Sequence, residues 1–99
     1  MQVWFFEDAL AEIEESRAWY RARSHSAEAA FLHDVDHAVS AIEDAPHRWP
    51  VYLSGTRRYV FQTFPYSLVY FAEDDVLNIV AVAHDKRRPG YWRKRLRRG

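Results

Sequence analysis

The hydrophobic residues of this 99-residue chain change their spacing once, near the middle of the sequence. Over residues 8–23 and 26–44 they recur every three or four positions, a spacing that is typical of amphipathic helices. Beyond them, alternation and short apolar runs indicate three strands, at residues 57–64, 67–72 and 76–83. Residues 1–6, apolar and rich in aromatics, predict one more strand. A chain this short has room for one core, so helices and strands must share it.

The links between the last three strands are too short to hold a crossover. Phe64-Pro65-Tyr66 makes a turn, because proline fixes φ and has no N–H to donate to a ladder, and Glu73-Asp74-Asp75 makes another. These turns predict an antiparallel meander. The order β-α-α-β-β-β then predicts an α+β fold, with the helix pair packed on one face of a twisted antiparallel sheet. Residues 1–99 are expected to form a single domain.

Composition excludes several classes of protein. A hydrophobic content of 48% with three glycines and four prolines argues against a disordered or fibrous chain, and the absence of cysteine excludes disulfides, thiol catalysis and cysteine-based zinc sites. No apolar segment approaches the roughly 20 residues of a membrane span, and the N-terminus lacks a basic leader region. We therefore expect a cytoplasmic protein with no membrane partner, no metal and no cofactor.

A formal net charge of zero conceals a strong asymmetry along the chain. Residues 1–50 hold ten acidic and four basic side chains, and residues 51–99 hold the reverse. The extreme is the basic tail, residues 86–99, which carries eight basic side chains and no acidic one. Such asymmetry indicates a polyanion or a charged protein as partner.

The junction between the last strand and the basic tail holds the best candidates for chemistry. His84 could act as an acid or base near neutral pH, and Arg87 could hold a phosphate and stabilise charge in a transition state. Cleavage of RNA through its own 2′-hydroxyl requires such groups and no metal. The alternative is a histidine that ends a strand, followed by a solvated basic turn.

Aromatic rings between cations, as in Tyr91-Trp92, are typical of proteins that stack on unpaired bases. Either ring could instead dock into the core, and we expect Trp92 to be packed and Tyr91 to be functional. The predicted catalytic residues are His84, Arg87 and Tyr91. The predicted substrate-binding residues are Arg57, Arg58, Lys86, Arg88, Arg93 and Lys94.

His33 and His37 stand four positions apart on the second predicted helix, with Asp34 between them. This spacing is close to the H-E-x-x-H zinc motif, but aspartate is shorter than glutamate and the motif needs a third ligand. The two histidines also lie off the apolar stripe, where a solvated polar face is expected. We assign them no metal.

Two segments resemble one protein family. They are Phe64-Pro65-Tyr66-Ser67-Leu68-Val69-Tyr70 and the run from Val80 to Trp92, preceded by Ala9-Leu10-Ala11-Glu12-Ile13, Ala18-Trp19-Tyr20, Phe31 and Ala41-Ile42. Together they resemble the RelE/ParE superfamily, the toxins of type II toxin-antitoxin modules, also called plasmid stabilisation proteins. The resemblance spans nearly the whole chain and implies a β-α-α-β-β-β toxin that is held inactive by a cognate antitoxin.

The resemblance leaves two targets open. In the RelE branch the toxin is a ribosome-dependent mRNA endoribonuclease, and in the ParE branch it inhibits DNA gyrase without being an enzyme. Tyr91, Arg58 and the cluster Lys86-Arg87-Arg88 match the first branch, whereas Ser67 and Asp85 stand where RelE has arginines. We expect a metal-independent RNase that acts on ribosome-bound mRNA, with gyrase inhibition as the alternative and a non-toxic nucleic-acid-binding module as a third interpretation.

Overall fold

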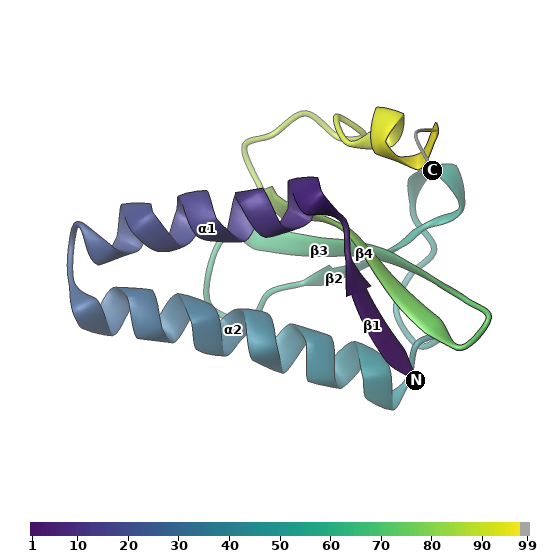
Figure 1. Ribbon diagram of the computed structural model, residues 1–99, viewed down its shortest axis with the longest axis horizontal. Coiled ribbons are helices and arrows are strands. Elements are labelled where there is room, and N and C mark those ends of the chain that lie inside the picture. The colour runs from purple at the N-terminus through teal and green to yellow at the C-terminus, as the bar shows by residue number, and fades with distance from the viewer. Residues whose placement is uncertain (98–99) are drawn as a thin grey trace.

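The computed structural model describes residues 1–97 and has two long helices beside a four-stranded sheet (Figure 1). The chain begins with strand β1 (Gln2–Phe5) and continues into helices α1 (Glu7–Arg21) and α2 (His25–Asp44). After the short 3-10 helix η1 (Leu53–Gly55) come strands β2 (Arg57–Val60), β3 (Tyr66–Glu73) and β4 (Val76–His84). A second 3-10 helix, η2 (Arg93–Arg97), ends the described chain. The predicted order of elements is confirmed.

The sheet is mixed, with strand order β1-β4-β3-β2. β2, β3 and β4 form the predicted antiparallel meander, and β1 joins β4 in parallel. The β3–β4 hairpin turns through Asp74 and Asp75, which have φ values of 52° and 61°. Aspartate accepts this left-handed conformation more readily than most residues, which suits a two-residue hairpin turn.

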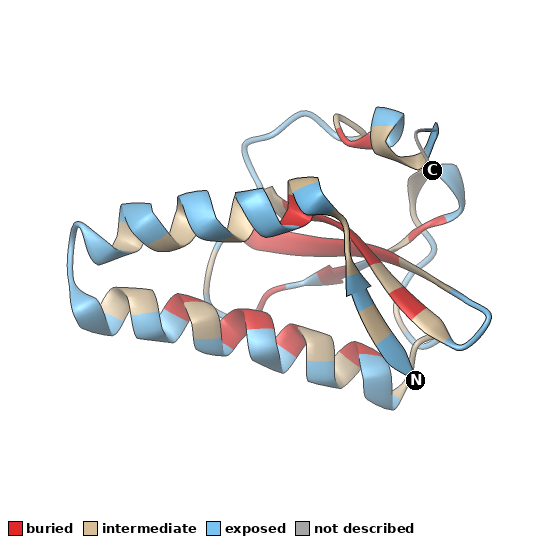
Figure 2. Ribbon diagram, viewed as in Figure 1, coloured by how far each residue is buried: buried red, intermediate tan, exposed pale blue. Residues whose placement is uncertain are grey.

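The main core lies between the helix pair and one face of the sheet (Figure 2). Phe31 and Ile42 of α2 are fully buried against Leu68, Tyr70 and Ile79 of the sheet. Phe31 also stacks on Tyr20 of α1, with ring centroids 5.3 Å apart. Among residues 1–97, no helix is both long enough and apolar enough to cross a membrane.

The opposite face of the sheet is covered by the chain's own C-terminal segment. The pairing of β3 with β4 shifts between Val69 and Tyr70, and this irregularity leaves Val80 without a partner on β3. Val80 and Ala81 both pack with Val69 and Trp92 in a second buried cluster. Trp92 is 1% exposed, so the prediction that it is packed is confirmed. The basic tail is therefore folded onto the sheet in its first half.

Several boundaries differ from the sequence prediction. Helix α2 begins at His25 rather than at residue 26, because Ser24 caps it by accepting a hydrogen bond from the Ala27 amide at 3.0 Å. β2 ends at Val60 instead of residue 64. The cause is Asp34, which is buried on α2 and accepts hydrogen bonds from the amides of Thr63 and Phe64 at 3.1 and 2.9 Å. These amides turn toward the helix and leave the strand.

Substitution of Asp34 by alanine should lower the free energy of unfolding by about 1–3 kcal/mol, because two buried backbone N–H groups would lose their acceptor. Urea denaturation measures the difference. Asp36→Ala is the matched control, since Asp36 is exposed on the same helix. Equal effects of the two substitutions would contradict the assigned role of Asp34.

Candidate functional site

The site is built around an open edge of the central strand β4. β1 pairs with Val76 to Ile79 and then ends, so the second half of β4 has no strand on that side. The Val80 carbonyl and the Val82 amide therefore need partners from elsewhere, because buried backbone groups are costly when unpaired. Two side chains that are far apart in the sequence provide them.

Glu12 of α1 and Arg95 of η2 meet at this edge and satisfy it. The Glu12 carboxylate accepts from the Val82 amide at 3.0 Å and from both Nη atoms of Arg95 at 2.9 Å. The guanidinium of Arg95 donates to the Val80 carbonyl at 3.1 Å and pairs with Asp8 at 3.2 Å. The Arg95 and Glu12 side chains are 12% and 14% exposed. This arrangement fastens the basic tail to the first helix.

Tyr91 is held by the same carboxylate. Its hydroxyl donates a short hydrogen bond to Oε2 of Glu12, and its ring lies beneath the guanidinium of Arg87, 3.9 Å from the ring centroid. Burial, and then the bond to Glu12, raise the pKa of Tyr91 far above its ordinary value of 10.0. The hydroxyl keeps its proton at neutral pH and points it at Glu12 in this hydrogen bond. It is therefore poorly placed to act as an acid or base.

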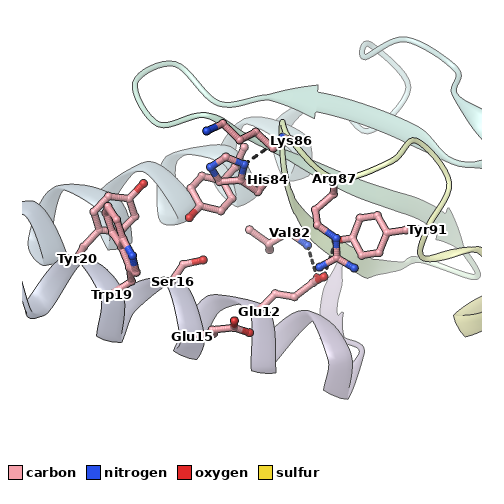
Figure 3. Close-up of a pocket in the computed structure, with 11 residues that line it drawn as sticks. Glu12, Glu15, Ser16, Trp19, Tyr20, Val82, His84, Lys86, Arg87 and Tyr91 are labelled. Atoms are coloured by element: carbon pink, nitrogen blue, oxygen red, sulfur yellow. Dashed lines mark hydrogen bonds between the residues drawn. The ribbon is translucent and has the colours of Figure 1, made fainter.

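A groove of about 390 Å³ opens beside this anchor, between α1 and the loop that follows β4 (Figure 3). Its α1 wall carries Glu15, Trp19 and Tyr20, and its other wall carries Lys86 and Arg87. Trp19 is 52% exposed. The groove therefore offers acid on one side, base on the other and aromatic surface at one end, a combination suited to a polypeptide.

His84 lies on the floor of the groove at the end of β4. Its ring packs edge-on against Tyr66 at a centroid distance of 5.0 Å, and its Nδ1 accepts a hydrogen bond from the Lys86 amide at 3.0 Å. A neutral imidazole that accepts at Nδ1 carries its hydrogen on Nε2. The structure thus places His84, Arg87 and Tyr91 together, as expected. Two of them are already engaged by the fold, because His84 accepts from the Lys86 amide and Tyr91 donates to Glu12.

A second, smaller pocket of about 90 Å³ lies on the other side of the same loop and also contacts His84, Arg87 and Tyr91. Arg58 and Arg88 line this pocket. The small pocket holds five of the nine predicted site residues, and Lys86 in the groove makes six.

The remaining predicted residues lie elsewhere. Arg57 projects from the opposite face of β2 to Arg58, and its guanidinium donates to the Trp49 carbonyl at 2.7 Å. Arg93 and Lys94 are exposed on η2 and line neither depression. Of these three, Arg57 has a structural partner that the sequence did not indicate.

Glu12 and Arg95 are not among the predicted site residues. No motif marks Glu12, and Arg95 is one of the eight basic side chains of the tail. Both are largely buried because they pair with each other across 83 residues of sequence. No local pattern could have revealed this contact.

His33 and His37, which the sequence placed at near-zinc spacing, are exposed on α2. Within residues 1–97, no three or more His, Asp and Glu side chains gather in a way that could hold a metal ion.

Comparison with known proteins identifies one family and one similar fold. Residues 5–89 match the family described as "ParE toxin of type II toxin-antitoxin system, parDE". A chain of the solved structure described as "Chromosomal ParDE TA system from P. aeruginosa" superposes with a TM-score of 0.73 and 16% sequence identity. The match covers 85% of this chain and 95% of that one, and shows a shared fold. No curated protein matches the chain.

Substitution of Glu12 by alanine should lower the free energy of unfolding by about 3 kcal/mol, because the largely buried Arg95 guanidinium would lose its carboxylate. Urea denaturation measures the stability, and hydrogen exchange at the Val82 amide should become faster. Glu15→Ala is the control, since Glu15 is exposed three positions after Glu12 on the same helix, and it should change stability by no more than about 0.5 kcal/mol. Slow exchange at Val82 in the Glu12 variant would contradict the anchor.

Four of the six tyrosines should ionise at raised pH, because burial is the main cause that raises the pKa of Tyr20, Tyr59, Tyr70 and Tyr91. The pKa of both Tyr20 and Tyr70 rises to about 12, and Tyr91 should ionise after them. Unfolded tyrosines ionise near pH 10. The unfolded state therefore loses protons first, so the stability that these groups contribute is complete below about pH 10 and declines as pH rises toward 12.

Absorbance after a rapid pH jump would resolve these ionisations before the protein unfolds. Tyr91→Phe should remove the last step of the titration and leave the earlier ones. A last step that persists in this variant would show that Tyr91 is not the most strongly protected phenol.

Proposed function

Because this chain belongs to the ParE toxin family of type II toxin-antitoxin systems, we propose that it stops growth by binding DNA gyrase through the groove beside its basic tail, without cleaving RNA. The engagement of Tyr91 by Glu12 carries the choice between targets. Cleavage of RNA needs groups that are free to move protons, and this hydroxyl, one of the predicted candidates, is committed to the fold.

The chemistry of the groove walls supports a protein as the bound partner. Trp19 and Tyr20 provide aromatic contact area, and Lys86 and Arg87 provide exposed positive charge. Aromatic and arginine side chains often dominate the energy of protein interfaces. A cognate antitoxin would neutralise the toxin by covering the same groove and bringing acidic side chains to Lys86 and Arg87.

Ribosome-dependent mRNA cleavage remains a second candidate, favoured by one observation. His84, Lys86 and Arg87 share the groove, and Nε2 of a neutral His84 is a donor that could protonate a leaving oxygen. Ser67 and Asp85 still stand where RelE has arginines, and this weakens the candidate.

A supercoiling assay with purified gyrase tests the proposal. The wild-type chain should block supercoiling, and Lys86→Ala/Arg87→Ala should require about tenfold more protein, because two interface cations would be lost. Arg48→Ala is the control, since Arg48 is exposed, lies over the ring of Trp49 and does not line the groove.

A parallel assay on translating ribosomes tests the second candidate. Two results together would overturn the gyrase proposal in favour of the RNase. The wild type would cleave mRNA while His84→Ala does not, and the wild type would leave supercoiling unaffected.

A further inference from the structure

The small pocket behind the β4 loop has a chemistry of its own. It lies on the sheet face away from the helices, where Arg58 of β2 stands opposite Val69 of β3 in the antiparallel register. Arg87 and Arg88 enter it from the loop after β4. Three arginines from two separate segments therefore line a space of about 90 Å³, which is the share of about three water molecules in the liquid.

Aromatic rings hold two of the three cations of this pocket in place. The guanidinium carbon of Arg58 lies 4.6 Å from the centroid of Tyr52, and that of Arg87 lies 3.9 Å from the centroid of Tyr91. Tyr91 is itself fixed by Glu12. Stacking of this kind orients a guanidinium without neutralising it.

Their charge is left largely uncompensated. Within residues 1–97, none of Arg58, Arg87 and Arg88 forms an ion pair with a carboxylate, in contrast to Arg17 and Arg95. Asp85 also borders the pocket and is exposed, so one acid stands against three bases.

The floor of the pocket offers a neutral donor. Ser67 is 6% exposed and lines the pocket, and its hydroxyl can donate a hydrogen bond. Several donors around a compact space suit an anion with more oxygens than a carboxylate has. Arginine forks match the oxygens of a phosphate in pairs.

We propose that this pocket binds a phosphate group of a DNA backbone. The inference deepens the proposed function, because gyrase acts on DNA and the pocket shares His84, Arg87 and Tyr91 with the groove. The toxin contacts a protein surface through the groove and a backbone phosphate through the pocket at the same time. The toxin thus recognises the enzyme with its DNA rather than the enzyme alone.

Phosphate binding is tested first with inorganic phosphate. At constant ionic strength, replacing chloride by phosphate should shift the arginine Nε–H resonances of the wild-type protein in NMR spectra. Arg48→Ala should respond as the wild type does, because Arg48 is an exposed arginine stacked on Trp49 outside the pocket. Arg58→Ala/Arg88→Ala should lose the response, and Arg88→Ala alone, at an exposed loop position, should weaken it without risk to folding.

The source of the phosphate is tested with a short DNA duplex and a single-stranded RNA. Arg58→Ala/Arg88→Ala should bind the duplex about tenfold more weakly than Arg48→Ala, and the slope of log affinity against log salt should fall by about one. No phosphate response in the wild type, or equal duplex binding by the two variants, would overturn the proposal. Variant-sensitive binding of RNA alone would overturn its assignment to DNA.

The pocket and the gyrase proposal can fail separately. A wild-type protein that binds phosphate and duplex in the pocket yet leaves supercoiling unaffected would overturn the target and leave the pocket standing. Inhibition of supercoiling that is equal in the wild type and in Arg58→Ala/Arg88→Ala, with no phosphate response, would overturn the pocket and leave the target standing.

Discussion

The carboxylate of Glu12 is the interaction on which the functional end of this protein depends. It accepts hydrogen bonds from a strand amide, a tyrosine hydroxyl and an arginine, and these donors come from β4 and from the basic tail. With Arg95 it completes the edge of β4 that β1 is too short to cover. One side chain of the first helix therefore sets the position of the loop, the groove and the pocket.

This anchor also changes the meaning of the charge asymmetry. The acidic first half and the basic second half meet inside the molecule, where Asp8 and Glu12 pair with Arg95. Part of the basic tail is thus consumed by the fold and is unavailable to a partner. The positive charge left for binding is concentrated at Lys86, Arg87, Arg88 and Arg58, which border the two depressions.

Much of the fold could be predicted, because its elements follow local periodicity. The helix stripe through Phe31, Val35 and Ile42 is buried as expected. The end of β2 could not be predicted, since it depends on Asp34 drawing the amides of Thr63 and Phe64 toward a helix some 29 positions earlier. The same holds for Arg57, whose partner is a carbonyl in the preceding loop.

The sequence by itself determined the order of elements and, through its resemblance to known toxins, the family. The order of elements follows from spacing and composition, which express each residue's preference for water or for the core. Only the tertiary structure decided which charged groups are free. Tyr91 and Arg95 are bound to Glu12, whereas Arg58 and Arg88 form no ion pair within residues 1–97, because such contacts depend on distances between segments that periodicity along the chain does not encode.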